Sequence, residues 1–318
     1  MKEPKKLQLA NTPTPLIKSQ FENCKFLIKR DDFTGVELSG NKVRKLEYLL
    51  YEAKRQKCNY IFTSGGDQSN HARATVIAAA SLGMKTKLFL WGRETKNSEG
   101  NLFLDQIANS EISFLTRKQY DIVPEIMETE KIKYEKKGNK VFVIPSGGSS
   151  ALGIWGYINF INELSQQTDL NKLDGITLAA GSAGTAAGIL IGSTLLGVDL
   201  KIYAVNVVYS AEVMREKIIT LAKQCIKDFK IDVLPNYNNV KILDGYSTEG
   251  YKNITPQKVS LIKKYFKESG ILLDPTYTGK AFVAYYDHFL KNKKSTKVLF
   301  LHTGGLFGTF AKRKDYLK

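Results

Sequence analysis

The sequence predicts an α/β protein in which mainly parallel sheets are covered by helices. Short runs of β-branched and aromatic residues alternate with helix-period segments along most of the chain. Such alternation is typical of parallel strands joined by helical crossovers. The chain has 318 residues, 43% of them hydrophobic, so one large domain or two interleaved domains can form.

The individual elements follow in chain order. Helix-period segments are predicted at 42–55, 70–82 and 184–196, and strands at 25–29, 60–63, 87–90, 141–144, 176–180, 201–207 and 298–302. Parallel sheets bind ligands at the carboxyl ends of their strands. The loops that follow these strands are therefore the first places to look for a functional site.

Composition and targeting signals favour a cytoplasmic protein. The N-terminal residues Met1–Lys6 are polar and lead into no apolar stretch of signal-peptide length. The uncharged stretch Gly175–Val198 is long enough to cross a bilayer, but its glycine and hydroxyl residues indicate a strand, a loop and a helix. The scattered cysteines Cys24, Cys58 and Cys225 favour a reducing compartment and argue against a disulfide framework.

The high positive charge does not by itself indicate nucleic-acid binding. The formal net charge is +16, but the lysines are spread along the whole chain and no arginine-rich tract occurs. A dispersed lysine surface is more often solvated than part of a binding groove. The histidines His71, His288 and His302 lack metal-ligand spacing. Neither a specific nucleic-acid partner nor a metal site is predicted.

Three loops are rich in glycine and small hydroxyl residues. They are Thr63–His71, Gly181–Thr185 and His302–Gly305. Glycines allow a ligand to approach the backbone closely, and amides at a helix start attract anions. The second loop fits a phosphate cradle well, because a helical segment follows it directly. Any one of these loops can equally be only a tight turn. Neither a dinucleotide GxGxxG motif nor a GxxxxGK[ST] nucleotide loop is present.

Lys42 is the candidate for a reactive amine. It stands at a predicted helix start after the Gly40–Asn41 turn, with Arg44 and Lys45 close in sequence. A helix N-terminus and nearby cations favour the neutral form of a lysine, which is the form that condenses with an aldehyde. Taken alone, one lysine in a lysine-rich chain is more often a surface residue.

Five motifs, in this order, resemble one enzyme family. They are Ser-Gly-Asn-Lys-Val-Arg-Lys-Leu-Glu, Gly-Asp-Gln-Ser-Asn-His, Ile-Pro-Ser-Gly-Gly-Ser, Leu-Asp-Pro-Thr-Tyr-Thr-Gly-Lys-Ala and His-Thr-Gly-Gly. From Thr12 to Gly308 the chain resembles the D-cysteine desulfhydrase and 1-aminocyclopropane-1-carboxylate (ACC) deaminase family, of pyridoxal-phosphate fold type II (tryptophan synthase β-like). This resemblance implies a pyridoxal 5'-phosphate cofactor, a large cofactor-binding domain of residues 1–45 and 155–318, and a small domain of residues 46–154.

The resemblance also implies the cofactor contacts. Lys42 would be the Schiff-base lysine and later the base for the Cα proton. Lys45, one turn on, would reach the cofactor phosphate, and Asn70 would donate to the ring oxygen. The phosphate would be bound by backbone amides and by the Thr185 hydroxyl. The amides belong to the loop made of Gly181, Ser182, Ala183, Gly184 and Thr185.

Substrate contacts are implied for the segment Ser69, Asn70 and His71. Ser69 would lie beside the substrate carboxylate or Cα, although a serine here can also cap the following helix. His71 is interpreted as a side chain of the substrate pocket or as one that supports the pocket residues. Tyr277 resembles the family tyrosine that borders the substrate. Tyr251 matches a second active-site tyrosine more loosely, since its flanking residues depart from the commoner Gly-Pro-Gly-Tyr, and Tyr246 is the alternative for that role.

Two threonines favour one of the family's reactions. Thr278 stands where the deaminases resemble one another in having glutamate, and Thr303 where they carry leucine. A hydroxyl facing the pyridine nitrogen leaves the ring a weaker electron sink than a carboxylate does. A weaker sink suits loss of a thiolate better than opening of a cyclopropane. We therefore expect α,β-elimination of D-cysteine to pyruvate, hydrogen sulfide and ammonia.

Other interpretations stay open. ACC deamination and elimination on another β-substituted D-amino acid are alternatives, because Ser149–Ser150 and Ala186 depart from the commoner family residues. A nonenzymatic, basic nucleic-acid binder is the candidate from a different class, and its binding would be salt-sensitive. The expected partner is a small amino-acid substrate, without a membrane partner. Family members commonly form homodimers, so a homodimer is also expected.

Overall fold

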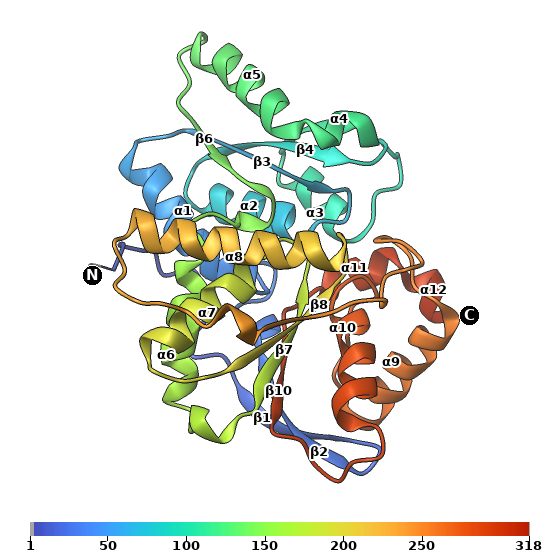
Figure 1. The fold of residues 1–318 in the computed structure, drawn as a ribbon. Helices are drawn as coiled ribbons and strands as arrows, with labels where there is room; N and C mark the ends of the chain where they lie inside the picture. The colour runs from blue at the N-terminus through green and yellow to red at the C-terminus, as the bar shows by residue number, and fades with distance from the viewer. Residues whose placement is uncertain (1–2, 318) are drawn as a thin grey trace.

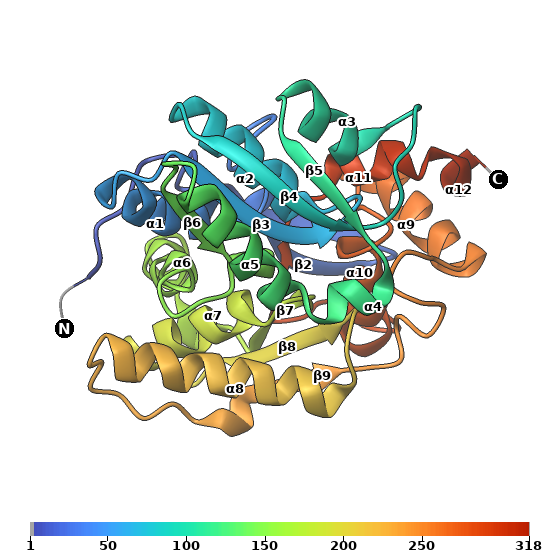
Figure 2. The same ribbon diagram turned by 90° about the horizontal axis from the view of Figure 1, so that it is seen from above.

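The fold consists of two sheets with helices around each (Figures 1 and 2). The structure is a computed structural model that describes residues 3–317. The larger sheet has the strand order β1-β2-β10-β7-β8-β9 and the smaller has the order β5-β4-β3-β6. All neighbouring strands run parallel except β1 and β2, which form an antiparallel pair. The predicted α/β class with mainly parallel sheets is confirmed.

The strands of the larger sheet come from both ends of the chain. They are β1 (Leu16–Phe21), β2 (Cys24–Arg30), β7 (Gly175–Ala180), β8 (Lys201–Asn206), β9 (Val240–Leu243) and β10 (Val298–His302). The smaller sheet is built from β3 (Tyr60–Gly66), β4 (Lys85–Trp91), β5 (Glu111–Leu115) and β6 (Val141–Ile144). All seven predicted strands are present. Sequence analysis did not predict β1, β5 and β9.

The helices are named in chain order. They are α1 (Lys42–Arg55), α2 (Asn70–Ser81), α3 (Gly100–Ile107), α4 (Arg117–Asp121), α5 (Val123–Glu135), α6 (Trp155–Ser165), α7 (Gly184–Leu195), α8 (Ala211–Asp228), α9 (Pro256–Ser269), α10 (Thr278–Tyr285), α11 (Leu306–Ala311) and α12 (Arg313–Leu317). The three predicted helices correspond to α1, α2 and α7. None of the helices in residues 3–317 is long and apolar enough to span a membrane.

Alternating side chains of the larger sheet pack on opposite helical layers. Leu178 and Leu301 belong to the core formed with α6, α7 and α8, whereas Ala179 and Phe300 belong to the aromatic core formed with α9 and α10. Successive residues of a strand point to opposite faces, so both faces of this sheet are covered. Buried parallel strands read as continuous apolar runs for this reason, which is how they were recognised in the sequence.

The smaller sheet is covered in the same way. Ile61 packs with α1 and α2 on one face, and its neighbour Phe62 packs with α5 on the other. The two sheets thus have separate cores, consistent with two structural units. The proposed boundaries at residues 45 and 154 stay a prediction.

A buried ion network fixes the start of α1 against the larger sheet. Arg44 Nη2 lies 2.8 Å from Asp31 Oδ1, and Arg44 Nη1 lies 2.7 Å from Glu163 Oε2 on α6. Lys29 Nζ on β2 also donates to Glu163, at 2.5 Å. Buried charges are tolerated when they are paired and hydrogen-bonded. The network therefore holds the helix that carries Lys42 in one position.

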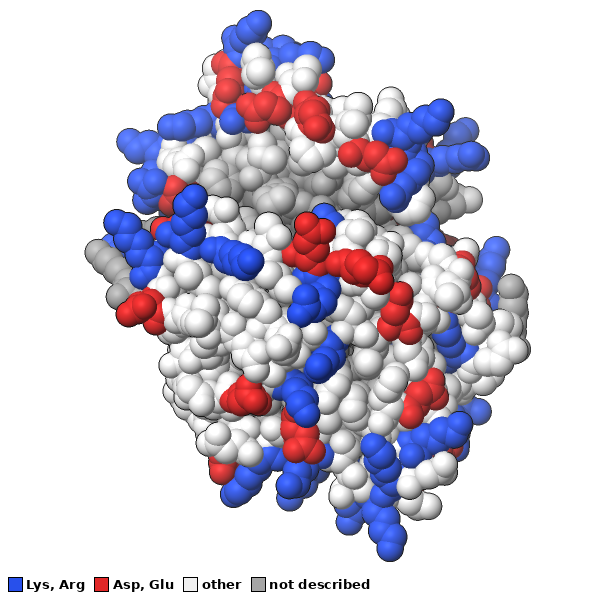
Figure 3. Space-filling view, viewed as in Figure 1, with Lys and Arg blue, Asp and Glu red and all other residues white. Residues whose placement is uncertain are grey.

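Acidic and basic side chains are interspersed on the face of the molecule shown in Figure 3. Lysine and arginine side chains there form no continuous stripe, and aspartate and glutamate side chains lie among them. This distribution agrees with the dispersed lysines of the sequence.

Candidate active site

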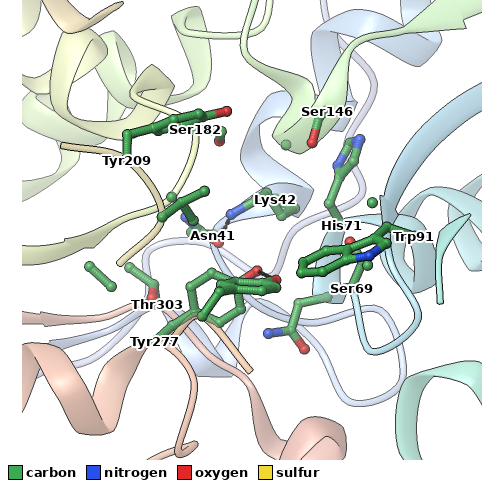
Figure 4. Close-up of a pocket in the computed structure, with 18 of the residues that line it drawn as sticks. Asn41, Lys42, Ser69, His71, Trp91, Ser146, Ser182, Tyr209, Tyr277 and Thr303 are labelled. Atoms are coloured by element: carbon green, nitrogen blue, oxygen red, sulfur yellow. Dashed lines mark hydrogen bonds between the residues drawn. The ribbon is translucent and has the colours of Figure 1, made fainter. Parts of the chain in front are cut away.

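A pocket of about 150 Å³ lies where loops from both sheets meet (Figure 4). Its walls come mainly from the carboxyl-terminal ends of strands in both sheets and the segments that follow them, and from the start of α1. This is the position that parallel strands predict for a ligand site. The residues that line it are Asn41, Lys42, Gly65, Gly66, Ser69, Asn70, His71, Trp91, Arg117, Tyr120, Ser146, Gly147, Ala179, Gly181, Ser182, Val208, Tyr209, Tyr251, Tyr277 and Thr303.

Lys42 is presented to the pocket by a turn that packs against the loop after β10. Asn41 N donates to Thr303 O at 3.0 Å. Gly40 has a φ of +94°, and a Cβ atom there would lie 3.0 Å from Thr303 O. The glycine is therefore needed both for its left-handed conformation and for the close approach of the two loops. Lys42 Nζ donates to Asn41 Oδ1 at 2.8 Å, which orients the amine.

The environment of Lys42 makes its amine easier to deprotonate than that of an ordinary lysine. Burial lowers its pKa to about 8, the charge of Asp274 opposes this shift, and the charge of Arg73 adds to it. The neutral amine was expected, but Arg44 was the wrong source of positive charge. Arg44 is neutralised by the Asp31 and Glu163 carboxylates, so burial and Arg73, on α2, lower the pKa instead.

Lys45 lies beneath the pocket as a buried amine without a carboxylate partner among residues 3–317. Its Nζ donates to Gly147 O at 3.2 Å and to Ser149 Oγ at 3.3 Å. Burial, followed by the charge of Lys42, lowers its pKa well below the ordinary value. Buried cations are normally paired, so this site suits an anionic group.

The glycine loop before α7 completes this anion site. Ser149 Oγ donates to Ser182 Oγ at 3.0 Å and accepts from Gly184 N at 3.2 Å. A Cβ atom on Gly184 would lie 2.7 Å from Lys45 Nζ. Backbone amides at the start of a 12-residue helix therefore lie beside a buried lysine, an arrangement that fits a phosphate.

Within the loop Gly181–Thr185, two residues reach the pocket wall. Gly181 and Ser182 line the pocket, whereas Ala183, Gly184 and Thr185 are not among its lining residues. The Thr185 hydroxyl accepts from Asn41 Nδ2 at 3.1 Å, so it supports the turn before Lys42. The predicted contact of this hydroxyl with a phosphate stays a prediction.

Ser69 and Asn70 begin α2 at the edge of the pocket. Ser69 Oγ accepts from Ala72 N at 3.1 Å, which is the helix-capping role that sequence analysis left open. Asn70 Oδ1 accepts from Asn101 Nδ2 at 3.0 Å. That contact fixes the amide so that the Asn70 Nδ2 group is the available donor. A donor at this position suits a ligand oxygen.

His71 is a neutral side chain with a defined tautomer. Thr63 Oγ1 donates to Ile144 O at 2.8 Å and lies 2.9 Å from His71 Nε2. Because the hydroxyl proton is used by Ile144, Nε2 must donate to Thr63 Oγ1, which leaves Nδ1 as an acceptor. Burial and then the charges of Lys42 and Lys45 lower the pKa of His71 well below its usual value. Its buried Nδ1 has no partner among the described residues.

Two of the tyrosines that line the pocket, Tyr251 and Tyr277, are in contact. The Tyr251 and Tyr277 hydroxyls are hydrogen-bonded, and the Tyr251 ring stacks on Trp91 at 6.3 Å between centroids. Burial raises the pKa of both hydroxyls, so both stay protonated near neutral pH. Tyr246 instead packs against His288, with ring centroids 6.1 Å apart. Tyr251 therefore lines the pocket beside Tyr277, whereas Tyr246 is not among the lining residues.

The two threonines occupy different positions. Thr303 lines the pocket, whereas Thr278 is fully buried and is not part of the pocket wall. Thr278 Oγ1 donates to Asp274 Oδ1 at 2.7 Å and accepts from Asp274 N at 2.9 Å. The hydroxyl is used to hold the turn before α10. Direct contact of Thr278 with a cofactor therefore stays a prediction.

His302 fixes the last glycine loop. Its Nδ1 accepts from Gly304 N at 3.1 Å, and its Nε2 lies 2.9 Å from Leu272 O. The backbone of this loop is thus fixed next to Thr303.

Sequence analysis missed several pocket residues. Trp91 ends β4 one residue beyond the predicted strand, and Arg117 lies over its ring at 5.0 Å from the centroid. Tyr209 follows β8, and Tyr120 lies on α4. Position after a strand was the available signal for Trp91 and Tyr209. Ser146 stands in a motif already noted, but its neighbours gave no indication of its orientation.

Comparisons with known proteins agree with the fold and with the motifs. The family model described as pyridoxal-phosphate dependent enzyme matches residues 7–304. A Thermotoga maritima protein named "Putative 1-aminocyclopropane-1-carboxylate deaminase" is 39% identical over 97% of this chain and 98% of its own length. The Arabidopsis thaliana "Bifunctional D-cysteine desulfhydrase/1-aminocyclopropane-1-carboxylate deaminase, mitochondrial" is 35% identical over 96% of this chain and 79% of its own. A crystal structure described as an ACC deaminase homologue matches with a TM-score of 0.89 and 34% identity, covering 99% of this chain and 96% of its own.

Proposed function

Since this chain belongs to the pyridoxal-phosphate-dependent enzymes, in the group of D-cysteine desulfhydrases and ACC deaminases, we propose that it eliminates hydrogen sulfide from D-cysteine. The products would be pyruvate, hydrogen sulfide and ammonia. The cofactor is pyridoxal 5'-phosphate, and the enzyme acts on a small-molecule substrate.

The observation that carries this proposal is the chemical character of the pocket wall. Among residues 3–317, the side chains that line it include no aspartate or glutamate. No lining side chain can therefore act as the acidic partner that keeps a ring nitrogen protonated. The cofactor supplies the electron sink for the bond broken at Cα, and a protonated ring makes that sink stronger. A thiolate leaves from Cβ readily enough for the weaker sink to suffice.

The residues present fit the cofactor at both of its ends. Lys42 Nζ would hold it covalently, since burial keeps a substantial neutral fraction of this amine near pH 8. Lys45, Ser182 and the amides of Gly181–Thr185 would hold the phosphate, because Lys45 is a buried amine that lacks a carboxylate partner in the described chain. Asn70 Nδ2 would donate to the ring oxygen.

Substrate would be oriented by the start of α2. Its amides and the Ser69 hydroxyl lie at the pocket edge and would receive the substrate carboxylate. Once released, Lys42 Nζ would take the proton from Cα. Asn41 Oδ1, 2.8 Å from Nζ, would keep the amine at the pocket wall.

Tyr251 and Tyr277 would stabilise the departing thiolate. The Tyr251 and Tyr277 hydroxyls share a hydrogen bond, and burial keeps both protonated. One hydroxyl can therefore donate to the departing sulfur while the other stabilises the oxygen left behind. His71, which lines the pocket, would lie beside the bound substrate or cofactor.

ACC deamination is the second candidate. It is favoured by the name of the Thermotoga relative and by the double activity named for the Arabidopsis relative. A nonenzymatic nucleic-acid binder is set aside because the chain belongs to a family of enzymes.

We also propose a cytoplasmic homodimer with a cofactor-binding unit of residues 1–45 and 155–318 and a smaller unit of residues 46–154. Phe103 and Ile107 on α3 and Phe310 on α11 are exposed apolar side chains, and a second copy could cover them. Light scattering should then give about twice the 35.7 kDa mass of one chain.

A substrate comparison tests the proposed reaction. Purified enzyme with cofactor would be given D-cysteine, L-cysteine, D-serine and ACC, and sulfide and 2-oxo acids would be measured. We expect sulfide and pyruvate from D-cysteine at the highest kcat/KM. Formation of 2-oxobutyrate from ACC without sulfide from D-cysteine would establish the second candidate instead.

A further inference from the structure

Lys280 is a fully buried lysine that no step above uses. It lies on α10, three residues after Tyr277, with 0% of its surface exposed. Its Nζ donates to Gly250 O at 2.8 Å and to Tyr251 O at 3.3 Å. A buried ammonium is costly unless it is hydrogen-bonded. The carbonyls of Gly250 and Tyr251 provide these hydrogen bonds. Both belong to the segment that carries the Tyr251 side chain.

A second lysine, Lys258, forms hydrogen bonds to the same segment from another helix. Lys258 on α9 donates to Tyr246 O at 2.6 Å and to Glu249 Oε2 at 2.7 Å. Glu249 Oε1 also lies 3.8 Å from Lys280 Nζ. Residues 246–251 are therefore held between α9 and α10 by two lysines that share one carboxylate.

The segment needs such support because it has no regular secondary structure. Residues 244–255 lie between β9 and α9 and belong to no helix or strand. Gly250 has a φ of +95° directly before Tyr251. The Tyr251 side chain must nevertheless meet the Tyr277 hydroxyl on one side and the Trp91 ring on the other. Loops without repetitive hydrogen bonding are mobile unless side chains fix them.

We propose that Lys280 is a positioning residue, which fixes the Gly250–Tyr251 backbone so that the Tyr251 hydroxyl stays on Tyr277. This inference rests on the proposed role of Tyr251 in the reaction. Since Lys280 comes from the same helix as the Tyr277 turn, one rigid element sets the spacing of both tyrosines. A misplacement of about 1 Å in a reacting group can cost about 100-fold in rate.

The charge of Lys280 is compatible with this role. Burial lowers its pKa to about 8, and the nearby Glu249 carboxylate opposes that shift. Lys258 lowers it further and Asp274 raises it. Neutralising Glu249 would therefore weaken the attachment of residues 246–251 to both helices, because Lys280 and Lys258 would each lose their nearby carboxylate.

The first test follows Trp91 fluorescence and does not depend on activity. The chain has two tryptophans, so a Trp155→Phe background leaves Trp91 as the single emitter. Lys280→Met should make Trp91 more accessible to acrylamide, as Tyr251→Ala should by removing the ring that lies on Trp91. Lys263→Met is the matched control, because Lys263 Nζ also donates to a backbone carbonyl, Tyr316 O at 2.6 Å, away from the pocket. Unchanged quenching in folded Lys280→Met would overturn the proposal.

The second test is a double-mutant cycle on the substrate that the enzyme accepts. Lys280→Met should lower kcat about 10- to 100-fold in the wild type, but less than about threefold when Tyr251 is already phenylalanine. Independent, multiplicative effects would contradict a positioning role. Because fluorescence is measured without substrate, an error in the assigned reaction leaves the first test intact.

If Lys280→Met does not fold, a second variant tests the same proposal. Glu249→Gln retains the shape of the segment and removes the shared charge. It should increase Trp91 quenching in the same direction by a smaller amount. Wild-type quenching together with wild-type kcat in Glu249→Gln would also overturn the proposal.

Discussion

Lys252 Nζ lies 2.8 Å from Asp67 Oδ1 and 4.7 Å from the centre of the Trp91 ring. Lys252 follows Tyr251, whereas Asp67 precedes the Gln68–Ser69 turn of the smaller sheet. This ion pair therefore joins the two sides of the pocket next to residues proposed to bind substrate.

Asp67→Asn should weaken closure of the pocket without changing its chemistry. Both side chains are about one-third exposed, and such pairs contribute up to about 1 kcal/mol. We expect KM to rise about two- to fivefold, with kcat within about twofold and a smaller effect at high salt. Glu52→Gln, which removes a similar pair with Arg55 at the far end of α1, is the control. A tenfold fall in kcat at unchanged KM would contradict this role.

Attachment of the cofactor to Lys42 should follow the pKa of this amine. That pKa is lowered from 10.5 to about 8, so the neutral form appears at lower pH than for an ordinary lysine. The rate of reconstitution with pyridoxal phosphate should rise about tenfold from pH 6 to pH 7 and level off above about pH 8. Stopped-flow absorbance of the bound cofactor measures this rate.

Two controls separate attachment from binding. Lys42→Ala should lose the visible band of the covalently held cofactor, whereas Lys54→Ala, an exposed lysine on the same helix, should keep it. Pyridoxine phosphate, which lacks the aldehyde, should bind without the same pH profile. A midpoint near pH 10 would show that burial does not set the reactivity of Lys42.

Lys45→Met should separate phosphate recognition from recognition of the ring. A hydrogen bond to a charged group contributes about 1.5–3 kcal/mol, so the Kd for pyridoxal phosphate should rise about 10- to 100-fold. Affinity for pyridoxal, which has no phosphate, should change less than about threefold. Because the buried amine lacks a carboxylate partner within residues 3–317, the cofactor-free variant should be at least as stable as the wild type. Equal losses for both ligands would place Lys45 away from the phosphate.

Glu163→Gln should destabilise the protein by about 3 kcal/mol, because Arg44 and Lys29 lose their shared anion inside the core. Burial raises the pKa of Glu163, but Arg44 and then Lys29 lower it to about 2 overall. A depressed carboxyl pKa stabilises the fold above the unfolded value of about 4.5, and this stabilisation is lost as pH falls towards 2. Urea unfolding at pH 7 and pH 3 measures both effects.

The exposed Glu22–Lys264 pair supplies the comparison. Glu22→Gln should cost less than about 1 kcal/mol at pH 7. If Glu163→Gln were equally mild, the buried network would not be what holds α1 in place.

The sequence predicted the sheets well because buried parallel strands leave a strong local pattern. The run Ile176–Ala180 and the run Val298–His302 are apolar on both faces, and the structure places both in the centre of the larger sheet. By contrast, β1 lies at the sheet edge and has three consecutive polar residues, Lys18, Ser19 and Gln20, between apolar ones. Such an edge strand has too weak a pattern to be distinguished from a loop.

Several features of the site were also readable in the sequence. The helix start at Lys42 and the glycine loop at Gly181–Thr185 are local motifs, and their residues are adjacent in the chain. The source of positive charge near Lys42 was not readable. Arg44, two residues away, forms ion pairs with Asp31 and Glu163. Arg73, thirty-one positions away in the chain, instead contributes to the lowered pKa of Lys42.

By itself the sequence determined the fold class, the family motifs and the place of Lys42 at the start of a helix, because each depends on residues that are close along the chain. The tertiary structure decided that Tyr251 lies in the pocket and that the Thr278 hydroxyl donates to Asp274. It also decided that Lys280 donates to the backbone next to Tyr251. These facts depend on contacts between segments that are distant in sequence. Burial and partner geometry, rather than residue type, determine whether such a group binds a ligand or supports its neighbour.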